Sequence, residues 1–600
     1  MIKQRHIYHS GIIGNCNFIA HVHRSTNINW LCWPSFQDSF IFGCLLDSKK
    51  GGEFNICLRD SKIESEQHYL ENTNILVTEV RGEHSGFRVI DFAPRFRQYE
   101  RYYKPLMLIR IVEPLYGSPS IKVNCHPKAN YGADEFQKSR GSNHVQFNYG
   151  KEHMRLTTNI PISHFFDTEG DGNFILNEPK YMILTYGSAL EAPLKSTAET
   201  FLQKTKTYWR NWTKRANIPN FYQEHIIRSA LVLKLHQYED TGAIIASSTT
   251  SLPESPGSGR NWDYRYCWVR DSFYVLTALS HIGKFEELEE FSTYITGITQ
   301  SDPGRLQPLY GILGKKTLTE RTLDYLSGYQ GNQPVRIGNQ AYEHIQNDVY
   351  GQAMIALLPL FTDRRFPKDE RKDAQNWLKY ILDKIQETID EKDAGIWEFR
   401  NIANRHAYSN LFQWAGASAA LKIAKQNGYK DIEKTATELI AKATGHIEQC
   451  YDPERQVYRN STEGANLDAS TLQLIMMNYL DPNSDKAKRH LEEIEADLKA
   501  KNGLFYRYIH RDDFGKPQST FLVCAFWYVE ALACVGRLDE AQETFERLLE
   551  YGNPLKLFSE DIHEEDGSQW GNFPQAYSHV GLMNAAYRIA MKLDRPFFLP

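Results

Sequence analysis

Two acidic segments, far apart in the chain, hold the glutamates best suited to acid–base chemistry. In the first, residues 393–400, Glu398 follows directly on Trp397. The second, residues 557–574, contains five carboxylates and begins its acidic run at Glu560. Cleavage of an acetal needs two carboxyl groups, one to protonate the leaving oxygen and one to activate water or attack the carbon directly. Glu398 and Glu560 are therefore candidates for the general acid and the general base of such a pair.

Each of these segments also fits a simpler interpretation. Burial of Glu398 against the apolar face of a tryptophan would raise its pKa and keep the carboxyl protonated near neutral pH, as a general acid requires. A glutamate close to the start of a helix is, however, often a solvated capping residue. The acidic loop at 557–574 also fits a solvated turn, whereas a calcium loop is disfavoured because the regular oxygen ligands and closing glutamate of an EF-hand are missing.

A third segment, residues 259–271, combines charged and aromatic side chains. Arg270 and Asp271 offer the paired donor and acceptor that neighbouring sugar hydroxyls need. Tyr264 and Trp268 offer flat apolar faces for the C–H surface of a sugar ring. A buried structural ion pair would account for Arg270 and Asp271 equally well, so both interpretations stay open at this point.

The elements that must position these residues follow from the spacing of apolar residues. After about residue 220 the spacing is helical and predicts twelve helices. Their predicted spans are 221–240, 266–282, 284–300, 339–362, 368–391, 406–427, 430–450, 468–480, 483–497, 519–536, 538–551 and 573–593. Long and very short connections alternate, which is typical of helical hairpins. Six hairpins closed into an (α/α)6 barrel would bring all the long loops, and with them both glutamates, to one end.

The first part of the chain has a different pattern. Short segments with alternating apolar residues, broken by Gly, Asn and Pro, predict antiparallel strands, for example at 75–80, 121–125, 145–149 and 181–186. An antiparallel β-sandwich is the simplest fold for such strands. With 600 residues the chain exceeds the size of one core, so we expect a β-sandwich domain at 1–195, a linker helix at 196–219 and a catalytic barrel at 220–600.

Composition narrows the possible partners. The formal net charge of -5 offers no broad basic field for nucleic acid. The nine cysteines show neither paired spacing nor the Cys/His clusters of a zinc site, so no metal is expected. Neither a signal peptide nor an apolar run long enough for a membrane span is seen, which predicts a cytoplasmic protein. Oligomer formation stays open.

The motifs of both parts together resemble glycoside hydrolase family 15, which includes glucoamylases, glucodextranases and certain prokaryotic trehalases. In the first part the resemblance rests on residues 13–15, 29–32, 36–47 and 89–94. In the second part it rests on residues 261–271, 334–339, 348–351, 395–398, 467–470 and 571–580, which follow the family in order. The resemblance covers nearly the whole chain.

That resemblance implies an inverting hydrolase that releases β-glucose from non-reducing ends and needs no metal or organic cofactor. It implies the role of general acid for Glu398 and that of general base for Glu560. The matching motifs also imply substrate contacts by Tyr264, Trp268, Arg270, Asp271, Trp397 and Arg336.

Three positions depart from the usual pattern of the bacterial members, namely Gln333, Asn410 and Ser519. These departures leave the preferred leaving group open. We expect an exo-acting hydrolase of α-linked gluco-oligosaccharides or polysaccharides, with a trehalase acting on α,α-trehalose as the alternative. A non-catalytic sugar-sensing module is a further alternative, but such a module would need neither glutamate.

Overall fold

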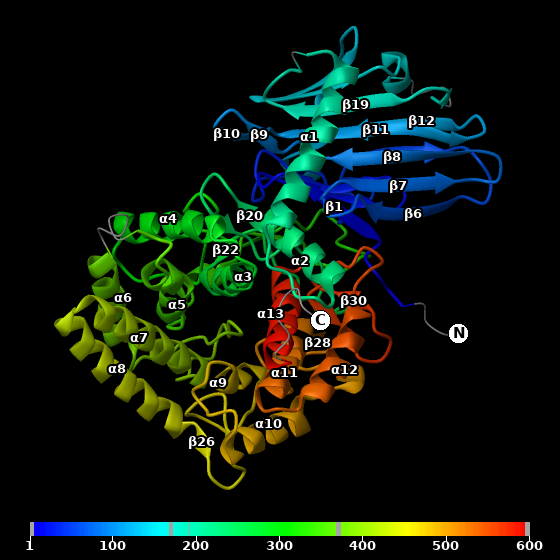
Figure 1. The fold of residues 1–600 in the computed structure, drawn as a ribbon. Helices are drawn as coiled ribbons and strands as arrows, with labels where there is room; N and C mark the ends of the chain where they lie inside the picture. Colours follow the sequence, from blue (N-terminus) through cyan, green and yellow to red (C-terminus); the bar gives the residue numbers. More distant parts are fainter. Residues whose placement is uncertain (1–4, 167–171, 191, 368–373, 594–600) are drawn as a thin grey trace.

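The computed structural model describes residues 5–166, 172–190, 192–367 and 374–593 (Figure 1). Its first part is a pair of antiparallel sheets, and its second part is a ring of helices below them (Figure 1). The prediction of a β-sandwich followed by an (α/α)6 barrel is therefore confirmed. The domain limits at residues 195 and 220 stay a prediction.

Two antiparallel sheets form the sandwich. The seven-stranded sheet has the order β1 (Ser10–Gly14), β2 (Ile19–His23), β3 (Ile28–Cys32), β5 (Glu53–Leu58), β12 (Ser120–His126), β18 (Phe174–Ile175), with β4 (Phe40–Phe42) paired to β3. The eight-stranded sheet has the order β15 (Gln137–Arg140), β16 (His144–Tyr149), β17 (Glu152–Thr158), β19 (Lys180–Tyr186), β11 (Met107–Tyr116), β8 (Gly86–Phe92), β7 (Leu76–Arg81), β6 (Glu64–Tyr69). The four strands predicted from alternation correspond to β7, β12, β16 and β19.

Helix α1 (Leu194–Lys214), predicted as a linker, covers the outer face of the eight-stranded sheet (Figure 1). Alternate residues of a strand point to opposite faces. In β11, Leu108 points into the core between the sheets, whereas Ile109 belongs to a separate apolar cluster packed against Phe201 of α1. The sheet is therefore buried on both faces in this region.

Within the described part of the barrel, six helical elements form the inner ring and six helices lie outside them (Figure 1). The inner elements are α3 (Val269–His281), α5 (Val349–Thr362), α7 (Ala407–Asn427), α9 (Gln473–Met476), α11 (Leu522–Cys534) and α13 (Ala576–Lys592). The outer helices are α2 (Gln223–His236), α4 (Glu286–Ser301), α6 (Ala374–Thr388), α8 (Lys430–Gln449), α10 (Asp485–Leu498) and α12 (Leu538–Leu549). The apolar α11 is buried all round, whereas α12 is amphipathic, as their positions require.

The structure shortens two predicted helices. The span 468–480 holds only a 3₁₀ turn (Ala469–Leu472) and the single turn α9, because Asn478 adopts the left-handed conformation with a φ of 57°. The span 339–362 is a 3₁₀ turn (Gln340–Glu343), an irregular link and then α5. The first six residues of the predicted helix 368–391 lie outside the described residues.

Sandwich and barrel share one continuous buried core. A single cluster of buried apolar side chains includes Ile12 and Trp30 of the sandwich as well as Leu235 and Trp527 of the barrel. A Cβ placed on Gly14 in β1 would lie 3.3 Å from Leu235 Cδ2 in α2, so these elements are in direct contact. The two parts are therefore joined by apolar packing as well as by the chain.

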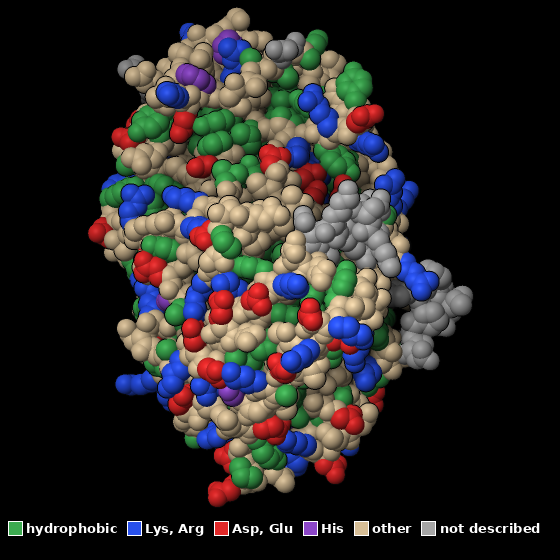
Figure 2. All heavy atoms as spheres, turned by 90° about the vertical axis from the view of Figure 1, so that its left-hand side faces the viewer, with side chains coloured by type: hydrophobic (Ala, Val, Ile, Leu, Met, Phe, Trp, Pro, Cys, Tyr) green, Lys and Arg blue, Asp and Glu red, His purple; other side chains and the backbone are tan. Residues whose placement is uncertain are grey.

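Charges on the visible surface are mixed. On the face shown in Figure 2, basic and acidic side chains are interspersed. Among the described residues, no helix has both the length and the apolar character needed to cross a bilayer.

Candidate active site

Two adjoining cavities lie among the loops that precede the inner helices. The first cavity is lined by Ala246, Tyr264, Trp268, Arg270, Asp271, Ile396, Trp397, Glu398, Arg507, Phe521, Glu560, Gln575 and Tyr577. The second cavity shares Tyr264, Trp397, Glu398 and Arg507, and adds Glu254, Arg260, Trp262, His344, Arg400, Tyr508 and Asp512 among others. Both proposed glutamates and five of the six predicted substrate contacts therefore meet at the first cavity.

Glu398 lies on the loop before α7 in a conformation that few residues adopt. Its φ is 59°, in the left-handed region that is unfavourable for a side chain other than glycine or asparagine. The preceding Gly395 has a φ of 66° and accepts a hydrogen bond from the Glu398 N–H, so the two residues form a tight turn. This turn presents the Glu398 side chain to both cavities.

The indole that contacts the Glu398 carboxyl belongs to Trp268 and not to the neighbouring Trp397. Trp268 donates its Nε1–H to Glu398 Oε1 at 2.7 Å, and Arg270 Nη2 lies 3.3 Å from the same oxygen. Trp397 instead donates to Asp468 Oδ2 at 3.0 Å. The contacts of Glu398 with these side chains are thus polar, which differs from the apolar face expected from the Trp-Glu sequence.

Arg270 joins three parts of the barrel. Besides Glu398, its guanidinium donates to Ile396 O at 2.8 Å and to Tyr577 Oη at 3.0 Å. Arg270 lies in the first turn of α3, Ile396 in the loop before α7 and Tyr577 in α13. A planar guanidinium with its donors fixed in this way holds a neighbouring carboxyl in one orientation.

Asp271 offers an acceptor to the first cavity. Its Oδ2 lies 3.4 Å from Arg270 Nε and accepts no hydrogen bond from the residues that the structure describes. The Oε1 of Gln575, which lines the same cavity, is likewise buried without a donor among them. Burial raises the pKa of Asp271 to about 6, partly offset by Arg270. Buried acceptors of this kind fit the hydroxyl donors of a sugar.

Glu560 is almost completely buried on the loop before α13. Its Oε1 accepts a hydrogen bond from Tyr264 Oη at 2.8 Å, and its Oε2 accepts one from the Asn572 N–H at 3.2 Å. Burial, reinforced by the negative charge of Glu254, raises the pKa of Glu560 well above the usual range of a glutamate. The hydrogen bonds from Tyr264 and Asn572 act in the opposite direction.

One aromatic pair connects the two glutamates. Tyr264 and Trp268 pack edge to face, with ring centroids 5.5 Å apart and an interplanar angle of 78°. Tyr264 donates to Glu560 and Trp268 donates to Glu398. The pair therefore links the two carboxyl groups, which line one cavity.

Arg336 does not line either cavity. Its Nη1 donates to Gly259 O at 3.0 Å and to Asn261 O at 2.9 Å, and its guanidinium lies 4.7 Å from the centre of the Trp262 ring. The structure thus gives Arg336 an indirect place in the site, and its contact with substrate stays a prediction. Arg336 fixes the backbone of the loop that carries Tyr264.

Sequence reasoning missed an ion pair at the second cavity, whose arginine also lines the first cavity. Arg507, on the loop before α11, pairs with Glu254 on the loop before α3, and both side chains are buried. Glu254 also accepts a hydrogen bond from Trp262 Nε1 at 3.0 Å. Arg507 stands between Tyr506 and Tyr508, and this aromatic flank in a long loop is the signal that could have identified it.

The three departures from the family pattern lie away from the cavity linings. Gln333 donates to Leu326 O at 2.8 Å, and Asn410 donates to His406 O at 2.9 Å inside α7. Ser519 donates to Asp561 Oδ1 at 2.9 Å and so reaches the residue next to Glu560.

Comparisons with known proteins bear on the family to which the chain belongs. The model of glycosyl hydrolases family 15 matches residues 220–587, and a trehalase-like N-terminal model matches residues 3–163. The chain is 33% identical to a trehalase of Thermoplasma volcanium, with 98% of this chain and 93% of that protein covered. It is 32% identical to a trehalase of Thermoplasma acidophilum, with 95% and 97% covered.

A trehalase of Mycobacterium tuberculosis is 29% identical, with 94% of this chain and 86% of that protein covered. The crystal structure of a bacterial glucoamylase complexed with acarbose has a TM-score of 0.70 at 14% identity, and covers 98% of this chain and 95% of its own. That similarity shows a common fold over both parts of the chain. By its family model, which spans most of the barrel, and by its full-length relatives, the chain belongs to glycosyl hydrolases family 15 and is a glycoside hydrolase.

Proposed function

We propose that this glycoside hydrolase is a trehalase, which cleaves α,α-trehalose into two glucose molecules. The observation that carries the proposal is the similarity to proteins named trehalase. This similarity extends over nearly the full length of this chain and of those relatives. The trehalase-like N-terminal model extends this match to the sandwich. The trehalase alternative is thus better supported than the oligoglucan hydrolase that the sequence alone favoured.

The pair of cavities supports a two-unit substrate. The first cavity would hold the glucose unit that is attacked, and the second would hold the leaving unit, with Glu398 and Tyr264 shared between them. Each arginine that lines the second cavity has an acidic partner: Arg260 pairs with Asp512, Arg507 with Glu254 and Arg400 with Glu320. A neutral, hydroxyl-rich sugar suits such a site better than a charged one.

In the proposed mechanism Glu398 is the general acid and Glu560 the general base. Glu398 gives its proton to the glycosidic oxygen as the bond to the anomeric carbon breaks. Glu560 takes a proton from a water molecule that attacks this carbon from the opposite side, so that the anomeric configuration inverts. Arg270 and Trp268 hold the acid, Tyr264 holds the base, and Asp271 accepts hydrogen bonds from the hydroxyls of the attacked glucose.

Substrate choice tests the proposal. We expect the purified protein to hydrolyse trehalose, and to leave maltose, isomaltose and starch largely uncleaved when the release of glucose is measured. Turnover of maltose or starch in preference to trehalose would reject the trehalase assignment in favour of an oligoglucan hydrolase. Loss of trehalose turnover in Glu398→Gln and Glu560→Gln, measured beside the native protein, ties the activity to this site.

The anomers released test the mechanism separately. Attack with inversion on one α-linked glucose gives β-glucose, while the leaving glucose departs as the α anomer. Proton NMR at early times should therefore show equal amounts of the two anomers. Release of α-glucose alone would mean that the configuration is retained, and would remove Glu560 from the role of a base acting on water.

A further inference from the structure

We propose that Tyr8 of the N-terminal segment and Arg265 of the barrel are positioning residues through which the sandwich holds Glu560 and its partner Tyr264 in place. The proposal rests on the proposed function of Glu560 as general base. It gives the sandwich a part in catalysis, although no sandwich residue lines either cavity.

Arg265 anchors the loop that carries Tyr264. Side chains alternate along this segment, so that Tyr264 faces the cavities while Asp263 and Arg265 point the other way. Arg265 and Asp263 form a fully buried pair, with Arg265 Nη2 2.7 Å and Nε 2.8 Å from the two carboxylate oxygens. The pair is closed to solvent, and its two residues flank Tyr264 in the sequence.

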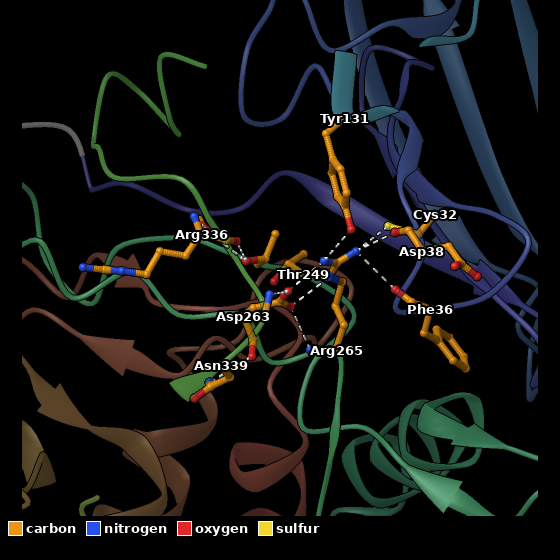
Figure 3. Close-up of polar contacts among 12 residues, drawn as sticks. Cys32, Phe36, Asp38, Tyr131, Thr249, Asp263, Arg265, Arg336 and Asn339 are labelled. Atoms are coloured by element: carbon orange, nitrogen blue, oxygen red, sulfur yellow. Dashed lines mark hydrogen bonds and ion pairs between the residues drawn. The ribbon is translucent and has the colours of Figure 1, made fainter. Parts of the chain in front are cut away.

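The same guanidinium reaches into the sandwich. Arg265 Nη1 donates to the backbone oxygen of Asp38 at 2.7 Å, and Nη2 donates to Tyr131 Oη at 3.3 Å (Figure 3). Nη1 also donates to Cys32 Sγ and to the backbone oxygen of Phe36 in the sandwich, each at 3.4 Å (Figure 3). The donors of Arg265 are thus divided between the catalytic loop and the sandwich, in a geometry that a lysine cannot reproduce.

Tyr8 supports the loop that carries Glu560. Its hydroxyl donates to Gly571 O at 3.0 Å, its N–H donates to Gln569 Oε1 at 3.0 Å, and its ring stacks on Phe573 with centroids 4.8 Å apart. Gly571 precedes Asn572, the residue whose N–H donates to Glu560. Tyr8 therefore fixes the peptide unit that supplies this hydrogen bond.

The two supports meet at Glu560. Asn572 Nδ2 donates to Trp262 O at 3.0 Å, which ties the loop before α13 to the segment held by Arg265. One support controls the hydrogen bond from Tyr264, and the other controls the hydrogen bond from Asn572. The ionisable groups that face Glu560 are Tyr8, Glu254, Tyr264, Arg507 and Asp561.

Tyr8→Phe tests the first support, with Tyr181→Phe as its control. Tyr181 is also a buried tyrosine and donates to Glu199 Oε1 at 2.7 Å, but this bond joins β19 to α1, away from the catalytic loops. We expect Tyr8→Phe to lower kcat by about 10-fold with KM nearly unchanged, because small displacements of reacting groups carry large costs in rate. The control should keep kcat.

Arg265→Lys tests the second support, with Arg110→Lys as its control. Arg110 is equally buried and pairs with Asp91 at 2.8 Å, but its contacts lie inside the sandwich. If Arg265→Lys fails to fold, Tyr8→Phe still decides the question, since it removes a single hydroxyl.

The decisive measurement is the acid limb of kcat/KM against pH, because hydrogen bonds to a carboxylate lower its pKa. In both test variants we expect this limb to move to higher pH, and in both controls we expect it to stay. If thermal stability or kcat falls while the acid limb of kcat/KM stays at the same pH, Tyr8 and Arg265 are only structural. That result would overturn the proposal.

Failure of the proposed function gives a different result. The profiles are measured on whichever α-glucoside the native protein hydrolyses best, so an error about trehalose does not affect them. Activity that survives in Glu560→Gln would instead show that Glu560 is not the base, whatever the limb does in the variants of Tyr8 and Arg265.

Discussion

At the scale of single residues, the two glutamates differ most in what surrounds them. The side chain of Glu398 is 21% exposed, and it accepts hydrogen bonds from the cationic guanidinium of Arg270 and from the indole N–H of Trp268. Glu560 is 1% exposed and lies near Glu254, whose charge adds to the effect of burial. A base in such a place must lose its proton before it can act on water.

We therefore expect activity to depend on the ionisation of Glu560 in the free enzyme. Because burial raises its pKa above the usual range, the carboxyl is protonated, and inactive as a base, at pH values where an exposed glutamate is ionised. The acid limb of kcat/KM should accordingly lie well above pH 4.5. A profile that stays flat down to about pH 4.5 would show that another group limits the reaction.

Glu560→Gln should lower kcat by about 10²- to 10⁴-fold, because it removes the group that takes the proton from water. Glu565→Gln is the matched control, since Glu565 is exposed on the same loop and lines neither cavity. Sugar binding, measured by calorimetry, should persist in both variants. A kcat near the native value in Glu560→Gln would exclude the proposed role.

At the scale of elements, periodicity and loop length predicted the barrel because both are local properties of the chain. Helical spacing marks the buried stripe of each helix, and the alternation of long and short links places the long loops at one end. The end of α9 was not predicted because Asn478 turns the chain by adopting a left-handed conformation. The spacing of apolar residues gives no sign of such a turn.

The contacts within the site could be predicted less well, because they join loops that are distant in sequence. Trp268 and Glu398 are 130 positions apart, and Glu254 and Arg507 are 253 positions apart. Adjacent Trp397 was the obvious neighbour of Glu398, yet the folded loop directs its indole N–H to Asp468. Side-chain direction within a loop depends on backbone turns that apolar spacing does not encode.

At Gly571 the backbone packs closely against the side chain of Glu560. Gly571 has a φ of 75°, and an added Cβ would lie 2.6 Å from Glu560 Cβ. We expect Gly571→Ala to lower both kcat and the melting temperature. Gly428→Ala is the control, since Gly428 has the same φ of 75° at the end of α7 with nothing within 4 Å.

In the control Gly428→Ala we expect a loss of about 1 kcal/mol of stability, which is the cost of the left-handed conformation for alanine. Its kcat should be retained. A native kcat in Gly571→Ala would mean that the loop can move away from Glu560 without loss of function.

At the scale of the whole molecule, sandwich and barrel behave as one body because they share a buried core. The cluster that includes Ile12 and Trp527 crosses between them without interruption. We expect calorimetry to show a single unfolding transition for the full chain. Two separate transitions would show that the sandwich unfolds on its own and that the shared core does not couple the two parts.

The left-handed backbone of Glu398 implies that this protein gives up some stability for the sake of activity. Replacing Glu398 by alanine or by glycine removes the same carboxyl contacts, but only glycine adopts a φ of 59° at little cost. We expect Glu398→Gly to be more stable than Glu398→Ala by about 1 kcal/mol in urea unfolding, although both are inactive. Equal stabilities would mean that the turn relaxes once the carboxyl is gone, and that the carboxyl's own contacts hold the backbone in this shape.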